Sequence, residues 1–295
     1  MIAVLALSPA LDVTYEVESL VIGEINRPTR TTVVAGGKGL NMARVAIAAG
    51  ADVRVLAMLG GANGRRIRAA LDRDGVPVTV VDIAAETRTC LAIVEEQGGA
   101  SSTDIYDTAS PVTAGEWDAF ALAAADLRSA DGRAADWTTV SGSLPEGVDP
   151  VALAAVLADA RGRGSRVALD MSGPALQTLA AAGDLVKVNR REASEILGRD
   201  LADAASACHA LHGELAVDAV VTDGIHPGAA LVDGDDLRIP APSVHGRFPA
   251  GSGDAFFAGI VHGLDRGLGS AASVAIAVDL AERNARRPGQ GLLAG

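Results

Sequence analysis

The sequence has 295 residues, a formal net charge of -12 at pH 7 and 3% aromatic residues. An acidic chain with few aromatic rings argues against a nucleic-acid partner, because such surfaces need positive charge and base stacking. No uncharged apolar run reaches the length of about 18 residues that a membrane span needs. The start MIAVLALSPALD lacks the basic segment of a signal peptide, and two cysteines are too few for a disulfide framework. We therefore expect a cytoplasmic protein without a membrane partner.

Short apolar runs that end in small or polar residues recur along the chain. This pattern is typical of buried parallel strands, and the runs lie at residues 2–7, 53–58, 138–141, 166–170, 184–188 and 219–222. Stretches rich in Ala and Leu lie between them and predict helices, for example at 117–128, 150–163 and 192–197. The alternation predicts an α/β fold with a doubly wound, mostly parallel sheet, helices on both faces, and ligands beyond the carboxyl ends of the strands.

Two segments, residues 11–34 and 88–108, interrupt this alternation. Both are rich in Thr and Val in near-alternation, and the second contains the turn-like run EEQGG at residues 95–99. Near-alternation of this kind indicates half-buried strands, so we expect a small β-sheet outside the main sheet. Because the sequence shows no internal repeat and no long linker, we expect one domain over residues 1–295 with these strands inserted into it.

Residues 251–254 read GSGD and precede an amphipathic run over 255–264. The backbone N–H groups of Gly251, Ser252 and Gly253, together with the helix dipole, would hold an anion. The Asp254 carboxylate would then face that anion as a general base for an attacking hydroxyl. The motif is compatible with phosphoryl transfer, although one such string, taken alone, more often marks a helix cap after a glycine-rich loop.

Residues 35–41 read AGGKGLN and lead into another apolar-periodic run over 42–49. This is not a Walker A loop, because Thr32 stands in place of its first glycine and Gly39 replaces the Ser or Thr that follows the lysine. Four further strings lie between this motif and GSGD: ETRTC (86–90), SGSLPEG (141–147), LDMSG (169–173) and VKVNRREASEILGR (186–199). In this order and at this spacing, the strings resemble the ribokinase-like (pfkB-type) carbohydrate kinases along almost the whole chain.

The resemblance implies a ribokinase-like fold in which the small sheet forms a lid over a sugar. On the sugar side, it implies that Asp12 accepts hydrogen bonds from hydroxyls and that Asn41 offers both donors and an acceptor. Gly36 and Gly37 would let the backbone approach the ligand, and Ser141 would lie on the floor of the same cleft.

Three cations, Arg27, Lys38 and Arg88, accompany these sugar-side residues. Relatives whose substrates are neutral sugars do not need such a cluster, whereas Arg and Lys side chains bind phosphate. The cluster therefore points to the hexose-phosphate branch of the family. For Arg27 and Arg88, taken singly, a solvated surface charge is an equal alternative.

The nucleotide side matches the family less closely. The family's K-x-N-x-x-E segment is present, and the resemblance implies that Asn189 and Glu192 act on Mg²⁺, mostly through water. The S-L-G-x-x-G phosphate loop appears as TDGIHPG at residues 222–228, with one extra residue and with Asp223 directed toward a triphosphate. The residues expected to bind the nucleotide are Lys187, Asn189, Glu192, Thr222, Gly224, Gly228 and, near the adenine, Asn284.

We expect an enzyme that uses ATP and Mg²⁺ to phosphorylate a hydroxyl of a sugar phosphate, converting fructose 1-phosphate to fructose 1,6-bisphosphate with Asp254 as the base. Tagatose 6-phosphate and fructose 6-phosphate are alternative substrates. A non-catalytic relative that only binds a sugar phosphate is an alternative from a different class, because the departures from the family pattern gather on the nucleotide side. A homodimer formed through the lid is the expected assembly.

The remaining histidine and cysteine patterns are weaker. Cys208, His209 and His212 fall on one helical stretch but lack a fourth ligand, which argues against a zinc site. His226 and His245 could border the nucleotide, but neither has a supporting motif.

Overall fold

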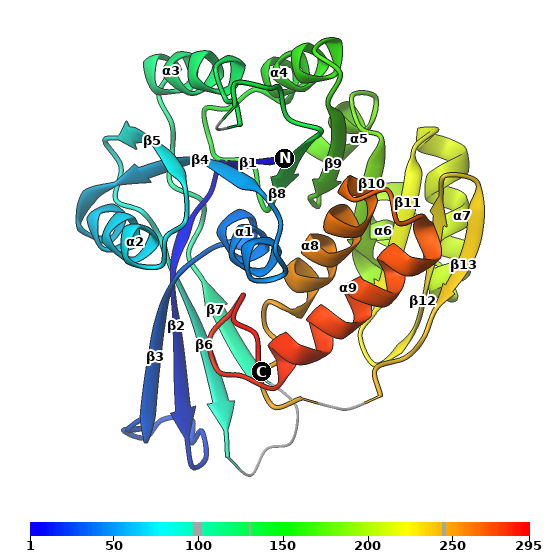
Figure 1. Ribbon diagram of the computed structural model, residues 1–295. Helices are drawn as coiled ribbons and strands as arrows, with labels where there is room; N and C mark the ends of the chain where they lie inside the picture. The colour runs from blue at the N-terminus through cyan, green and yellow to red at the C-terminus, as the bar shows by residue number, and fades with distance from the viewer. Residues whose placement is uncertain (97–101, 130, 244–245) are drawn as a thin grey trace.

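The computed structural model describes residues 1–96, 102–129, 131–243 and 246–295. Its main feature is a nine-stranded sheet in the order β13-β12-β11-β10-β9-β8-β1-β4-β5 (Figure 1). The pairs from β5 to β11 are parallel, whereas β12 and β13 form an antiparallel edge. The strands are β1 (Ile2–Ala6), β4 (Val53–Gly60), β5 (Val78–Ile83), β8 (Trp137–Ser141), β9 (Arg166–Asp170), β10 (Leu185–Asn189), β11 (Asp218–Asp223), β12 (His226–Val232) and β13 (Asp235–Ile239).

Helices cover both faces of this sheet, because successive side chains of each buried strand point to opposite faces. Val4 of β1 packs in one cluster with α1 (Lys38–Ala48), α2 (Gly61–Arg73), α8 (Ser252–Asp265) and α9 (Ser270–Ala285). Leu5 packs in the other cluster with α3 (Ala114–Ala125), α4 (Pro150–Gly162), α5 (Ala175–Ala180), α6 (Arg190–Leu197) and α7 (Ala204–Leu215). The predicted doubly wound α/β fold is confirmed.

A second, four-stranded sheet in the order β3-β2-β6-β7 extends away from the main body (Figure 1). Its strands are β2 (Ala10–Val17), β3 (Arg30–Gly36), β6 (Thr89–Glu95) and β7 (Ser102–Tyr106). In β2 the buried positions include the polar residues Asp12, Thr14 and Glu16. The predicted small sheet is therefore present, with one face that is polar and covered. Positions 97–99 of the predicted EEQGG turn lie outside the described residues, and the single-domain organisation stays a prediction.

All six predicted main-sheet strands are present, with ends that differ by at most two residues from the expected ones. The strands β5, β12 and β13 were not predicted. In the β12–β13 hairpin, the HPG and DD runs contain residues that are depleted in strands. These strands form at the sheet margin because the neighbouring strand offers unpaired backbone groups there.

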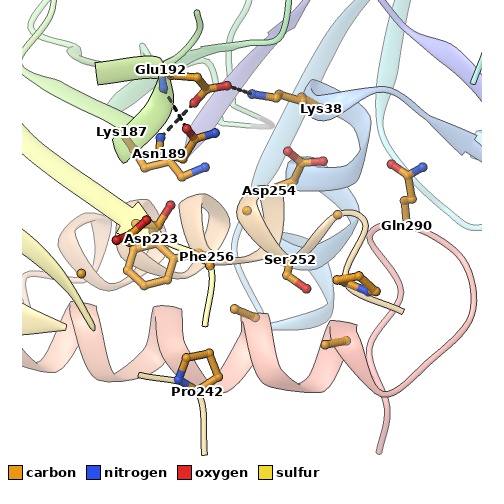
Figure 2. A pocket seen from close by; sticks show the side chains of 18 of the residues that line it. Lys38, Lys187, Asn189, Glu192, Asp223, Pro242, Ser252, Asp254, Phe256 and Gln290 are labelled. Atoms are coloured by element: carbon orange, nitrogen blue, oxygen red, sulfur yellow. Dashed lines mark hydrogen bonds and ion pairs between the residues drawn. The ribbon is translucent and has the colours of Figure 1, made fainter. Parts of the chain in front are cut away.

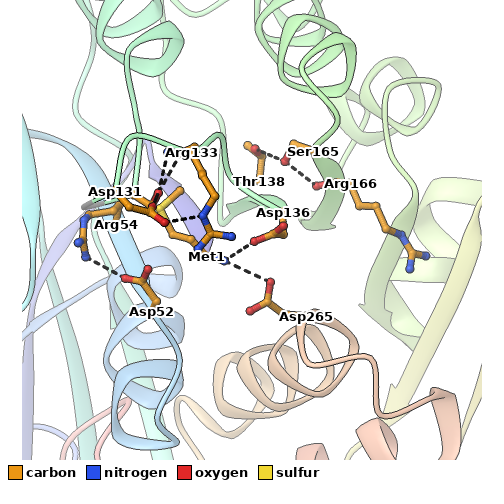
Figure 3. A network of polar contacts seen from close by, with 11 residues as sticks. Met1, Asp52, Arg54, Asp131, Arg133, Asp136, Thr138, Ser165, Arg166 and Asp265 are labelled. Atoms are coloured by element: carbon orange, nitrogen blue, oxygen red, sulfur yellow. Dashed lines mark hydrogen bonds and ion pairs between the residues drawn. The ribbon is translucent and has the colours of Figure 1, made fainter.

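Polar contacts tie the amino ends of the parallel strands together (Figure 3). The Met1 ammonium group lies 2.5 Å from an Asp136 carboxylate oxygen and 3.6 Å from Asp265. The Thr138 and Ser165 hydroxyls are 2.9 Å apart, joining β8 to the start of β9. The carboxyl ends of the strands, at the opposite edge, are left open for a ligand. In the described part of the chain, no helix is long and apolar enough to cross a membrane.

Helices α8 and α9 approach each other closely through small residues. A Cβ atom added at Gly259 of α8 would lie 2.5 Å from Cα of Ala277, and one added at Gly263 would lie 2.6 Å from Cα of Ser273. No real Cβ atom fits at such distances, so these glycines set the spacing of the two helices. This spacing also fixes the start of α8, where the GSGD motif lies.

We predict that Gly259→Ala lowers the free energy of unfolding by about 1–3 kcal/mol through overpacking, although Ala is normally the better helix former by about 1 kcal/mol. Gly213→Ala in α7 is the matched control, because a Cβ there meets nothing within 4 Å. Urea unfolding of both variants is the measurement. A Gly259 variant as stable as the control would contradict the packing argument.

Candidate active site

A cavity of about 630 Å³ lies beyond the carboxyl ends of the strands, between the main sheet, the second sheet and the start of α8. It is where ligands bind in doubly wound folds. Its walls include residues from both predicted halves of the site: Asp12, Gly37, Lys38, Arg88, Lys187, Asn189, Glu192, Thr222, Gly224, Gly228, Gly251, Ser252, Gly253 and Asp254.

The GSGD motif forms the turn into α8, as predicted. Gly251 has a φ of +84°, a left-handed conformation that favours glycine, and α8 begins at Ser252. A Cβ at Gly253 would lie 3.0 Å from the Lys187 amino group, so glycine keeps this loop close to a cation. The side-chain amide of Asn284 supports the turn by donating to the Ala250 carbonyl at 3.0 Å. Gly251, Ser252 and Gly253 line the cavity at the helix start. The Ser252 N–H donates to the Pro249 carbonyl at 3.1 Å, which leaves the N–H groups of the two glycines as the ones suited to an anion.

Asp254 lies in the first turn of α8, and its side chain is only 5% exposed. Burial, followed by the negative charge of Asp170, raises its pKa to about 7. The Asn41 amide donates to Asp254 Oδ2 at 2.9 Å, which orients the carboxylate. Figure 2 shows Asp254 in the cavity wall. A carboxylate with a pKa near neutrality is well matched to accepting a proton from a hydroxyl.

Asp170, at the end of β9, was not among the predicted site residues. Its fully buried carboxylate lies between two amino groups, with Lys38 Nζ 3.1 Å from Oδ1 and Lys187 Nζ 3.1 Å from Oδ2. These lysines lower the pKa of Asp170 against the opposing effect of burial. For Lys38, the charges of Asp170, Glu192 and Asp254 outweigh burial and raise its pKa. The LDMSG string at a strand end was the sequence signal for this position.

Asp12 faces the same cavity from the second sheet. Its Oδ2 accepts from the Gly37 backbone N–H at 3.2 Å and lies 3.4 Å from the Asn41 amide. Burial raises its pKa to about 6. A Cβ at Gly36 would lie 2.0 Å from Asp12 Oδ2, so this contact requires glycine there. Asp12 and Asn41 are therefore brought together as predicted.

Asn189 and Glu192 cap helix α6 reciprocally. Each backbone N–H donates to the other side chain at 2.9 Å, while Glu192 Oε1 lies 3.8 Å from Lys38 Nζ (Figure 2). Among the described residues, no group of three or more His, Cys, Asp or Glu side chains could hold a metal ion. One carboxylate oxygen and one amide suit Mg²⁺ bound mainly by water and phosphates rather than by a protein cage.

The TDGIHPG segment forms the end of β11, a turn at Gly224 and the start of β12. The negative charge of Asp223 is compensated, because the Arg190 guanidinium donates to its two carboxylate oxygens at 3.1 and 3.0 Å. The predicted repulsion from a triphosphate is therefore offset within the protein. Arg190 comes from the start of α6, and its role was not predicted.

Five predicted residues do not line the cavity: Arg27, Gly36, Asn41, Ser141 and Asn284. Asn41 is buried and donates to Asp254. Arg27 is exposed in the connection between β2 and β3, whereas Lys38 and Arg88 line the cavity. Ser141 and Gly36 are buried behind the cavity wall. Asn284, expected near the adenine, is fully buried and bonds to Ala250, Ser252 and Gly291, so its side chain supports the α8 turn.

The cysteine and histidine side chains noted in the sequence make separate contacts. Cys208 donates to the Ala219 carbonyl, and His209 contacts Asp236, so their side chains are engaged in different contacts. His226 lines the cavity, whereas His245 lies outside the described residues.

Residues 2–293 match the family model described as pfkB family carbohydrate kinase. The chain belongs to this family. A curated 1-phosphofructokinase of Rhodobacter capsulatus is 34% identical over 283 residues, covering 94% of this chain and 87% of the relative. Escherichia coli phosphofructokinase-2, in complex with potassium, has the same fold with a TM-score of 0.87 at 23% identity, covering 99% of this chain and 95% of that one.

A possible 1-phosphofructokinase from Thermotoga maritima also shares the fold, with a TM-score of 0.85 at 21% identity and coverage of 99% and 94%. The predicted family and enzyme class, a kinase of carbohydrates, are confirmed by the whole-chain match and the curated relative.

The raised pKa of Asp254 predicts a pH-dependent stability difference. This carboxyl titrates near pH 3.8 in the unfolded chain and near pH 7 in the fold. The fold therefore binds the proton more tightly, and that stabilisation is lost as the pH rises from about 4 to about 7. The Asp254→Asn variant has no titrating group at this position. Its free energy of unfolding relative to wild type should therefore rise with pH, by up to about 1.4 kcal/mol per pH unit across this window.

Urea unfolding at several pH values measures this difference. Asp279→Asn serves as the control, since that side chain is 65% exposed, and its difference from wild type should stay nearly constant. A flat difference for Asp254→Asn would show that the carboxyl titrates in the fold as it does in the unfolded chain.

Proposed function

We propose that this carbohydrate kinase transfers the γ-phosphoryl group of ATP to the free primary hydroxyl of fructose 1-phosphate. The observation that carries the proposal is the position of Asp254. Its buried carboxylate, oriented by Asn41, lies one residue after the turn of residues 251–253 that lines the cavity. A base and an anion-binding turn at one point suit phosphoryl transfer to a hydroxyl.

In the proposed reaction, the sugar oxygen attacks the γ-phosphorus while Asp254 takes its proton. The new oxygen–phosphorus bond forms as the bond to the bridging oxygen of ADP breaks. The N–H groups of Gly251 and Gly253 stabilise charge on the transferring group, and Lys187 lies beside Gly253 to assist. Asn189 and Glu192 would hold Mg²⁺, which neutralises phosphate charge when bound.

The sugar side supports a phosphorylated acceptor. Arg88 donates only to backbone carbonyls, those of Asp107 at 3.0 Å and Ser8 at 3.2 Å, among the contacts of the described residues. Its positive charge thus remains for a ligand phosphate, and Lys38 lines the same cavity. Tagatose 6-phosphate and fructose 6-phosphate are the alternative acceptors.

The nucleotide base is proposed to lie in an apolar slot of the same cavity. One wall comes from the end of β13 and the residues that follow it, and the other from α9. Apolar walls of this kind accept a planar base by burying its faces. The slot is formed by Ile239, Pro240, Pro242, Val278 and Ala281.

A homodimer through the second sheet is part of the proposal. Exposed large apolar side chains gather on that sheet and on its β2–β3 connection: Val21, Ile22, Ile25, Val33 and Ile105. Apolar side chains gathered on a protruding sheet favour association.

We also propose a cytoplasmic location, which the two unpaired cysteines favour.

Replacing the base tests the proposed chemistry. We predict that Asp254→Asn lowers kcat at least about 100-fold, because the proton acceptor is lost, while the affinity for fructose 1-phosphate changes only a few-fold. A coupled ADP-release assay across a panel of sugar phosphates is the measurement. Wild-type kcat/KM should also fall below about pH 7, where Asp254 becomes protonated. A variant with more than a tenth of wild-type turnover would remove Asp254 from this role.

The Asp223–Arg190 pair yields a second test, on the nucleotide side. Asp223→Leu should free the Arg190 charge for the phosphates and lower the KM for ATP about tenfold, equivalent to about 1.4 kcal/mol. Arg190→Leu should raise it, because Asp223 is then unpaired, and the double variant should lie near wild type. An unchanged KM in both single variants would place the pair away from the phosphates. Failure of the wild-type protein to bind millimolar nucleotide would favour the non-catalytic alternative.

A further inference from the structure

Gln290 stands at the edge of the cavity on a backbone bend that follows α9. Its neighbours Gly289 and Gly291 have φ values of +98° and +67°, conformations that favour glycine. The Gly291 N–H donates to Asn284 Oδ1 at 2.9 Å, and Arg44 donates to the Gln290 carbonyl. The bend is therefore held from two sides, which fixes the direction of the Gln290 side chain.

The Gln290 carboxamide lies beside the proposed base (Figure 2). Its Oε1 is 3.5 Å from Nδ2 of Asn41, the same nitrogen that donates to Asp254 Oδ2 at 2.9 Å. The side chain is 6% exposed, and its Nε2 has no hydrogen-bond partner within the described parts of the chain. A buried amide donor without a partner is costly, so this nitrogen is suited to a ligand oxygen.

A second unpaired atom belongs to Asp12, which contacts the same Asn41 amide from the second sheet. Asp12 Oδ1 is also buried without a partner among the described residues, while its Oδ2 lies 3.4 Å from Asn41 Nδ2. Asn41 Nδ2 thus lies within 3.5 Å of one oxygen of Asp12 and one oxygen of Gln290, while the other polar atom of each side chain, an acceptor on Asp12 and a donor on Gln290, has no partner among the described residues. A hydroxyl can both accept and donate, and a polyhydroxylated ligand is the class that uses both.

We infer that Gln290 determines acceptor specificity: its Nε2 donates a hydrogen bond to a sugar hydroxyl adjacent to the reacting one. This inference rests on the proposed function, because the reacting hydroxyl is placed by Asp254. Gln290 takes no proton in the reaction. It selects the acceptor and aligns it with the base.

Gln290→Leu tests the inference, since it keeps much of the side-chain volume and removes the donor. We expect the KM for fructose 1-phosphate to rise about tenfold, with the KM for ATP within twofold of wild type. The matched control is Gln177→Leu, because Gln177 Nε2 donates to the Ile196 carbonyl at 2.7 Å outside the cavity. This control should leave both KM values unchanged even if it lowers stability.

Deoxy analogues of fructose 1-phosphate locate the contact. For the analogue that lacks the contacted hydroxyl, wild type and Gln290→Leu should have equal kcat/KM. For the analogues that keep that hydroxyl, the tenfold difference should persist. An equal penalty for every analogue, or no change in the sugar KM, overturns the inference.

Gln290→Glu tests the position of Gln290 through the pH profile of kcat/KM, which would not change if the residue were purely structural. The added negative charge beside Asp254 should raise its pKa and shift the acidic limb of the kcat/KM profile to higher pH. An unshifted limb argues that Gln290 lies apart from the base and overturns its placement.

Calorimetric binding of fructose 1-phosphate without nucleotide separates the two proposals. Weaker binding by Gln290→Leu than by wild type, in a protein that shows no phosphoryl transfer, would support the specificity role while the proposed function failed. Equal binding in an active enzyme would overturn the specificity role alone.

Discussion

The site must keep several carboxylates and two lysines in one buried volume that also receives the phosphates of its substrates. An isolated buried ion would be strongly destabilising, and the fold avoids this by placing Asp170 between Lys38 and Lys187 at 3.1 Å from each. The same arrangement sets the strength of the base. Asp254 is buried near Asp170, and both effects raise its pKa to about 7. Positive charge for phosphate and a carboxylate able to accept a proton thus come from one electrostatic arrangement.

The topology brings these groups together from distant parts of the chain. Asp170 and Asn189 end neighbouring parallel strands, so both lie at the same edge of the main sheet. Helix α8 approaches that edge from one face and brings Asp254 to it, while the second sheet adds Asp12 from outside. The short distances between these elements depend on missing side chains, because a Cβ at Gly36 or Gly253 would meet Asp12 or Lys187. The glycines in the motifs therefore serve close approach as well as anion binding.

Local pattern predicted the elements and the turn at GSGD well, since each depends on residues adjacent in sequence. The six apolar runs and the GSGD turn formed where expected. What could not be predicted depends on contacts between distant residues. Asn41 and Asp254 are separated by 213 positions in the sequence, so their hydrogen bond could not be predicted. Nothing near Gln290 in the sequence indicates its place in the cavity. Asn284 is buried in the cavity wall, a placement that could not be predicted because sequence order does not distinguish a side chain that lines a cavity from one that supports its wall.

The nucleotide side shows how a departure from a family pattern can be compensated elsewhere. A carboxylate at position 223 alone would repel phosphates, which made the loss of activity a reasonable alternative. Arg190 lies 33 positions away in sequence and pairs with both oxygens of Asp223, so the added negative charge is matched by a positive one at the same wall. Because electrostatic potential sums over neighbours, the relevant quantity is the charge of the pair. The same rule applies to the sugar side. Arg27 is exposed on the β2–β3 connection, whereas Lys38 and Arg88 line the cavity, and the hydrogen bonds of Arg88 to carbonyls leave its charge uncancelled. Within one chain, the proposed binding of an acceptor phosphate therefore depends on these two cations.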